Sequence, residues 1–163
     1  MKLIDSYFPA SIAAKEQFFR LVVFNYLLSN GDAHLKNFSR LDCEGNNDGV
    51  LAPAYDLINT KLHIDDSDLA LKEGLYEGDY NYQSYNTLGY YAFDDFYEFG
   101  LRIGMLPTRV KRFIKSFLLE SDTIAHMIER SFLNTEAKNN YSKLYTEKLK
   151  RLTTSTLELI DSQ

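Results

Sequence analysis

The chain has 163 residues, of which 45% are hydrophobic and 25% charged, and its formal net charge is −5. This length and composition predict one globular domain over residues 1–163 and exclude a fibrous or disordered chain. The acidic balance offers no basic stripe, so we expect no direct nucleic-acid binding. No apolar run reaches the roughly 18 residues of a membrane helix, and the single cysteine, Cys43, excludes an internal disulfide. We therefore expect no membrane insertion and a cytoplasmic location.

The first predicted element is a helix over residues 13–28. One set of its residues recurs at three- and four-residue steps, namely Phe18, Leu21, Val22, Asn25 and Leu28. Apolar residues also occupy its other faces, which is typical of a helix in the interior of a domain. Asn30 and Gly31 are expected to supply the left-handed geometry that ends it, so that a loop emerges from a rigid, buried element.

The next part of the chain predicts a β-hairpin, with strands at residues 38–41 and 50–55 and a polar turn at 42–49. Residues 69–72 are predicted as a short strand, and the rest of 61–86 as loop. Helices are expected at 93–102, 107–119 and 121–132. A fourth helix is indicated by one face made of Tyr141, Leu144, Tyr145, Lys148, Leu149 and Leu152. The predicted fold is mainly α, with one small hairpin.

Two polar motifs flank the predicted hairpin. The first runs Asn30-Gly31-Asp32-Ala33-His34-Leu35-Lys36-Asn37-Phe38, and the second runs Pro53-Ala54-Tyr55-Asp56-Leu57. A hairpin returns the chain to near its starting point, so we expect Asp56 to lie beside Asn37. Tyr55 and Leu57 are expected to pack around Asp56 and hold it in place.

The residue types in these motifs suit phosphoryl transfer, which needs a carboxylate at the acceptor hydroxyl, a cation near the transferring phosphate and oxygen ligands for Mg²⁺. Asp32 and Asn37 have the D-x-x-x-x-N spacing of the protein-kinase catalytic loop. Lys36 can supply the cation, and the side chains of Asn37 and Asp56 can supply oxygen ligands for Mg²⁺. Taken singly, Asp32 is an ordinary turn residue, Lys36 a surface charge and His34 a structural histidine.

Together the motifs closely resemble the C-terminal region of HipA-like serine/threonine kinases, the toxins of bacterial toxin–antitoxin pairs. The matching stretches are Asn30-Gly31-Asp32-Ala33-His34-Leu35-Lys36-Asn37-Phe38-Ser39 and Leu51-Ala52-Pro53-Ala54-Tyr55-Asp56-Leu57. The resemblance implies the helical C-lobe of a protein-kinase-like fold, with ATP and Mg²⁺ as cofactors. It also implies a protein substrate and an antitoxin protein as partners.

The resemblance assigns roles to individual positions. Asp32 would be the catalytic base, with Lys36 at the reacting phosphate. The ATP phosphates would be lined by His34, Leu35, Lys36 and Asn37, next to Tyr55 and Asp56, and Asn37 and Asp56 would hold Mg²⁺.

The sequence departs from that family before the first predicted helix. Only about a dozen residues precede it, without a Gly-rich loop, and neither Lys2 nor Lys15 lies in a strand that could supply the ATP-contacting lysine. We therefore expect negligible kinase activity from this chain alone. We also expect its partner to be a separate N-terminal lobe or an upstream-encoded half. An apolar surface left exposed could bind that partner or a second copy. The aromatic residues of 76–97 either contribute to such a surface or belong to the core.

Three alternatives remain open. A lipid or small-molecule kinase could carry the same D-x-H-x-x-N loop, and a non-catalytic remnant of a kinase lobe could serve only to bind partners. A metal-dependent phosphohydrolase could use Asp32, His34 and Asp56 as ligands, although the other histidines, His63 and His126, have no ligand-like spacing.

Overall fold

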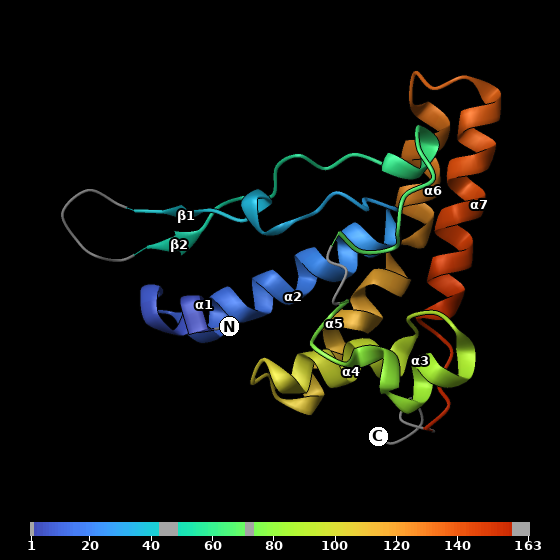
Figure 1. Cartoon of the computed structure of the whole chain (residues 1–163). Coiled ribbons are helices and arrows are strands. Elements are labelled where there is room, and N and C mark those ends of the chain that lie inside the picture. The colour runs from blue at the N-terminus through green and yellow to red at the C-terminus, as the bar shows by residue number, and fades with distance from the viewer. Residues whose placement is uncertain (1, 43–48, 71–73, 158–163) are drawn as a thin grey trace.

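The computed structural model describes residues 2–42, 49–70 and 74–157, and it is mainly helical (Figure 1). The α-helices in chain order are α1 (Lys2–Tyr7), α2 (Ser11–Leu27), α3 (Gln83–Leu88), α4 (Phe93–Arg102), α5 (Pro107–Leu119), α6 (Ser121–Arg130) and α7 (Thr135–Arg151). Three short 3-10 turns are η1 (Leu35–Asn37), η2 (Thr60–Leu62) and η3 (Asp79–Asn81), and the two strands are β1 (Arg40–Leu41) and β2 (Val50–Leu51). No helix among the described residues is long and apolar enough to cross a membrane.

The core forms where α2 packs against α4, α5 and α7. Its largest fully buried side chains on α2 are Phe19, Tyr26 and Leu27, and Phe96 of α4 packs on Tyr26 with ring centroids 4.8 Å apart. The buried face of α2 is therefore not the stripe that the sequence predicts, because Phe18, Leu21 and Val22 lie half-buried beside it. The prediction of an interior helix is nevertheless confirmed, since apolar side chains on several faces of α2 belong to the core or pack against it.

The later helices begin and end close to the predicted residues. Pro107 opens α5, where its fixed backbone angle suits the first turn and its missing N–H is not needed. The predicted face of α7 is confirmed, with Tyr145, Lys148 and Leu152 buried. Buried Asp94, at the start of α4, accepts a hydrogen bond from the Thr156 N–H at 2.7 Å, and this bond ties the segment after α7 to the core.

The predicted hairpin exists, but its strands are shorter than expected. β1 and β2 pair antiparallel with Arg40 opposite Leu51, and only residues 43–48 of the predicted turn lie outside the described residues. The Gln17 side chain of α2 donates to the Ala52 carbonyl at 3.3 Å, so the hairpin is fixed to the helix that precedes it.

Two predictions for residues 61–86 were wrong. Leu69 and Ala70 form bends rather than a strand, while residues 71 and 72 of that predicted strand lie outside the described residues. The helix α3 occupies part of the predicted loop, and Gly89 ends it in the left-handed conformation with φ 72°. The aromatic residues of 76–97 divide between core and surface: Tyr91, Phe93 and Phe96 are buried, whereas Tyr80 is exposed.

A buried hydrogen bond links two parts of this core. The Tyr26 hydroxyl donates to the Tyr91 carbonyl at 2.7 Å, and burial raises the pKa of Tyr26 far above its usual range. We expect Tyr26→Phe to lower the free energy of unfolding by about 1–3 kcal/mol, because a buried carbonyl loses its donor. Urea unfolding measures this loss. Tyr80→Phe, at a 64% exposed position, is the control and should stay within about 0.5 kcal/mol of the parent. Equal losses in the two variants would contradict the prediction.

Candidate functional site

The site begins at the end of α2, where the chain turns sharply. The Asn30 N–H donates to the Asn25 carbonyl at 2.9 Å and the Ser29 N–H to the Tyr26 carbonyl at 3.1 Å, the pair of bonds that defines a Schellman cap. Ser29 takes the left-handed conformation, with φ 58°. The prediction that Asn30 and Gly31 provide this geometry was wrong by one residue.

Gly31 is instead required because another segment approaches it closely. A Cβ atom at Gly31 would lie 2.5 Å from the Asp66 carboxylate and 2.5 Å from the Ser67 carbonyl. The Gly31 N–H donates to the Thr60 hydroxyl at 2.9 Å, and that hydroxyl is also 3.2 Å from the Ser29 carbonyl, to which it donates. Residues 60–67 therefore hold the backbone that leads directly into Asp32.

The buried side chain of Asn30 joins the two motifs. Its Nδ2 donates to Asn25 Oδ1 at 2.8 Å and to the Asp56 carbonyl at 3.0 Å. Its Oδ1 lies 3.2 Å from the Asp32 N–H, which donates to it. Asp56 has φ 55°, an unfavourable angle for a residue other than glycine, although Asp tolerates it better than most. These contacts fix the backbone at both carboxylates.

The structure brings Asn37 and Asp56 together as the sequence predicts. Asn37 Nδ2 donates to Asp56 Oδ2 at 2.8 Å and lies 3.5 Å from the Asp32 carbonyl oxygen. Asn37 occupies the end of the single turn η1, and Asp56 follows β2 after four further residues. The short hairpin thus returns the second motif to the first, and the Asn37 amide lies between the Asp56 carboxylate and the Asp32 backbone carbonyl.

The other predicted site residues surround this group less closely. His34 Nε2 is 3.9 Å from Asp32 Oδ1, while Leu35 and Lys36 are exposed. Lys36 forms no ion pair with the residues described in the structure, so its ammonium is available to a ligand. Tyr55 is 42% exposed, and its hydroxyl donates to the Lys36 carbonyl at 2.9 Å. Tyr55 therefore ties the motifs together mainly by hydrogen bonding rather than by the expected packing.

Two hollows border the motifs, one lined by Asp56 and the other by Asp32. A small one of about 10 Å³, the size of a single water or ion, is lined by Asn30, Asn37 and Asp56. A larger cavity of about 500 Å³ opens beside Asp32 and is lined on its other sides by Asp66, Asp68 and the rings of Tyr85, Tyr90 and Tyr91. A metal-sized hollow and a large cavity thus share the loop that carries Asp32.

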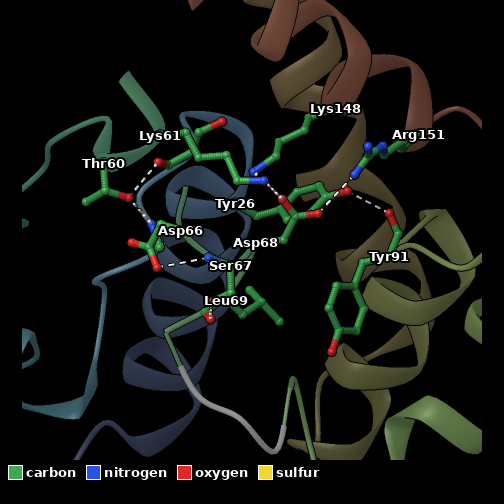
Figure 2. A network of polar contacts seen from close by, with 12 residues as sticks. Tyr26, Thr60, Lys61, Asp66, Ser67, Asp68, Leu69, Tyr91, Lys148 and Arg151 are labelled. Atoms are coloured by element: carbon green, nitrogen blue, oxygen red, sulfur yellow. Dashed lines mark hydrogen bonds and ion pairs between the residues drawn. The ribbon is translucent and has the colours of Figure 1, made fainter. Parts of the chain in front are cut away.

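Asp68, which lines the large cavity, belongs to an ion cluster (Figure 2). The Asp68 carboxylate lies 3.1 Å from Lys61 Nζ, 3.1 Å from Lys148 Nζ and 2.9 Å from Arg151 Nη1. Lys148 is buried, and its ammonium also lies 4.7 Å from the centre of the Tyr26 ring. Because Lys148 and Arg151 belong to α7, the cluster fixes residues 61–68 to that helix.

Burial and charge act in opposite directions on this cluster. Burial disfavours the Lys148 ammonium and lowers its pKa to about 8, although the Asp68 carboxylate opposes the shift. Burial alone would raise the pKa of Asp68, but Lys148 and Lys61 outweigh it and hold that pKa below its usual range. The carboxylate therefore stays charged and neutralises part of the surrounding positive charge.

Sequence reasoning missed the residues that position the site. The sequence predicts only turn geometry for Asn30 and indicates no role for Thr60 or Asp68. A usable signal was present for Asn30, because Asn25 interrupts an apolar helix five residues earlier and a buried amide requires a polar partner. Asp68 offered no such signal, since its three partners lie as far as 83 residues away in the sequence.

The mainly helical fold is similar to that of a kinase-like lobe. A HipA chain, solved in the Shewanella oneidensis MR-1 toxin–antitoxin complex of HipA, HipB and operator DNA, superposes with a TM-score of 0.71 and 20% identity, covering 97% of this chain and 36% of that one. The family model described as the HipA-like C-terminal domain matches residues 1–139. The chain belongs to this family.

Two curated proteins are also similar to the chain. One from Haemophilus influenzae, named "Putative kinase", is 29% identical over 155 residues, which are 91% of this chain and 45% of that protein. Another from Sinorhizobium fredii, named "Putative kinase Y4dM", is 43% identical over 60 residues, which are 37% of this chain and 14% of that protein. The chain thus spans less than half the length of each of these three similar proteins.

The two asparagines that contact Asp56 provide a matched pair of variants. We expect Asn30→Ala to lower the free energy of unfolding by about 2–3 kcal/mol, because the Asn25 side chain and the Asp56 carbonyl lose a buried donor. Asn37→Ala, on the exposed side of Asp56, should cost less than about 1 kcal/mol. Urea unfolding compares them, and similar losses would show that Asn30 does not organise the site.

The lowered pKa of Lys148 predicts a pH dependence of stability. An unfolded lysine has a pKa of 10.5, so between pH 8 and 9, below the range in which unfolded tyrosines ionise, the unfolded chain binds more protons at Lys148 than the folded chain, and this contribution makes the free energy of unfolding rise with pH. Lys148→Met should flatten this rise, whereas Lys150→Met, at an exposed position of α7, should not. Urea unfolding across this range tests it, and an unchanged slope in Lys148→Met would refute the assignment.

Proposed function

We propose that the chain is the catalytic-loop and metal-binding lobe of an ATP-dependent serine/threonine kinase of the toxin–antitoxin type. The observation that carries the proposal is the 2.8 Å contact between Asn37 and Asp56, with Asp32 on the same loop. A kinase requires these three residue types around one magnesium-nucleotide site. Membership of the HipA-like C-terminal domain family supports the same chemistry.

Asp32 is the proposed catalytic base. Its side chain is 62% exposed and borders the large cavity, so an acceptor hydroxyl can approach it from that side. The Asp32 carboxylate would orient the serine or threonine hydroxyl of a protein substrate and accept its proton as the oxygen attacks the γ-phosphorus. The anchored backbone at Gly31 and Asp32 limits the freedom of this group, which favours a productive orientation.

Asn37 and Asp56 would hold Mg²⁺, which prefers hard oxygen ligands and takes only one or two of them from carboxylates. The Asn37 amide now points its Nδ2 at Asp56, so it would have to rotate to present Oδ1 to the metal. The small hollow between them has room for one ion. When bound, Mg²⁺ neutralises the charge of the ATP phosphates and fixes their geometry.

The remaining loop residues would contact the nucleotide phosphates. Lys36 has an exposed ammonium that can stabilise negative charge on the transferring group. His34 and Leu35 belong to the same loop. Tyr55, the neighbour of Asp56, holds this loop next to Asp56 through the hydrogen bond from its hydroxyl to the Lys36 carbonyl. These residues cover only one side of a nucleotide.

The other side of the nucleotide site is proposed to come from an N-terminal kinase lobe. The similar proteins are more than twice the length of their matching region, and the exposed Asp32, Lys36 and Leu35 leave the loop open to water. A second lobe would exclude water and complete the phosphate contacts. An antitoxin protein is a further proposed partner, because the similar Shewanella structure holds HipB beside HipA.

Phosphate transfer tests this function. The chain is fused behind the N-terminal part of the Haemophilus influenzae relative and assayed with labelled ATP, Mg²⁺, a mixture of cellular proteins and vesicles containing phosphoinositides. We expect label on protein serine or threonine from the fusion and none from the chain alone. Asp32→Asn and Asp56→Asn should each lower the rate at least about 100-fold, the usual contribution of a positioned base or metal ligand.

The matched control is Asp122→Asn, an exposed carboxylate on α6, which should leave the rate unchanged. Label that appears only on inositol lipid would identify a lipid kinase instead. A folded fusion that transfers no phosphate to any acceptor, or whose rate survives Asp32→Asn, would reject the proposed mechanism and favour a lobe that serves only to bind partners.

A further inference from the structure

We infer that Asp68 is a positioning residue for the acceptor side of the site, and that it acts by closing residues 61–68 into a loop that holds Asp32. This inference rests on the proposed function, because it concerns the residue proposed as the base. Asp68 itself lies outside both sequence motifs and contacts none of the proposed phosphate or metal ligands.

The two ends of the loop meet at one carboxylate. Lys61 Nζ lies 3.1 Å from Asp68 Oδ1, so a contact across seven residues closes the segment. Lys148 and Arg151 then attach the same carboxylate to α7, which is a 17-residue helix packed in the core. A closed and anchored segment has far fewer conformations than a free loop of this length.

Both ends of this closed loop also touch Gly31. At one end Thr60, the neighbour of Lys61, accepts the Gly31 N–H through its hydroxyl. At the other end Asp66 and Ser67, just before Asp68, leave no space for a Cβ atom at Gly31. The backbone at Gly31 is therefore held between the two ends, and the next residue is Asp32.

The same cluster connects residues that line the cavity beside Asp32. Asp66, Asp68, Leu69 and Tyr90 all line this cavity. The Arg151 guanidinium lies 4.7 Å from the centre of the Tyr90 ring while it pairs with Asp68, so one cation connects two residues of the lining. Loss of the Asp68 charge would therefore loosen two things. These are the segment 61–68 that supports Asp32 and the part of the cavity lining that Arg151 connects.

Charge explains why a single carboxylate can hold this arrangement. Three cations surround Asp68, and Lys148 is buried among them. Without the carboxylate their mutual repulsion would be uncompensated in a partly buried place. Asp68→Asn keeps the size of the side chain, so its effects report the lost charge rather than a cavity.

Amide hydrogen exchange of the full chain tests the inference without requiring activity. Asp68→Asn should speed exchange of the Gly31 N–H at least about tenfold more than exchange of core amides on α2 and α4. The control is Glu16→Gln, which removes the carboxylate that pairs with Arg109 between α2 and α5, with Nε of Arg109 2.6 Å from Oε1. This control should destabilise the chain without a selective effect at Gly31.

A double variant separates positioning from general stability. Adding Lys148→Met to Asp68→Asn removes the most buried of the three cations and should recover stability, yet it cannot restore the contact with Lys61. Gly31 exchange should therefore stay fast in the double variant. If Gly31 protection instead returns together with stability, or if it falls only in step with the core in Asp68→Asn, Asp68 has a merely structural role and the inference is wrong.

Kinetics of the active fusion provide the second readout. Asp68→Asn should raise the KM for the protein acceptor, or lower kcat, by at least about tenfold while the KM for ATP changes less than twofold. Equal changes in both KM values would overturn the inference. Loss of activity in Asp32→Asn checks the proposed function separately, and the exchange measurement stays decisive for Asp68 if no version of the fusion transfers phosphate.

Discussion

The buried carboxamide of Asn30 is the interaction on which the site depends. Its Oδ1 accepts a hydrogen bond from the Asp32 N–H. Its Nδ2 donates hydrogen bonds to the Asn25 side chain on α2 and to the Asp56 carbonyl. One side chain thus connects a helix of the core with the backbone of both aspartates. A buried amide that lost any of these partners would be left with an unsatisfied polar group, so the three parts are fixed together.

This arrangement maintains an unfavourable backbone at two places. Within the described residues, the non-glycine positive φ angles are those of Ser29 and Asp56, and they lie at the two positions joined by Asn30 and its neighbours. Each such angle costs about 1–3 kcal/mol and persists only where surrounding contacts determine it. At Ser29 the helix cap provides those contacts, and at Asp56 the bonds to Asn30 and Asn37 provide them.

The site combines a rigid, buried support with a solvent-exposed surface. Behind the loop lie the buried end of α2 and the Asp68 cluster, whereas Asp32, Leu35 and Lys36 face solvent. Such a division suits the proposed function, in which the lobe would hold its own reacting groups in place and receive nucleotide and acceptor at its surface. It also agrees with the length of the similar proteins, in which the matching region is less than half of the chain.

The sequence by itself determined the helical class, most helix positions and the meeting of Asn37 with Asp56, because periodicity and hairpin return are local properties of the chain. It placed the cap one residue late and missed α3, since turn-forming residues there are equally typical of loops. Only the tertiary structure decided why residue 31 must be glycine and which cations surround Asp68. Those contacts join residues far apart in the sequence, and no local pattern records which distant side chains will be neighbours after folding.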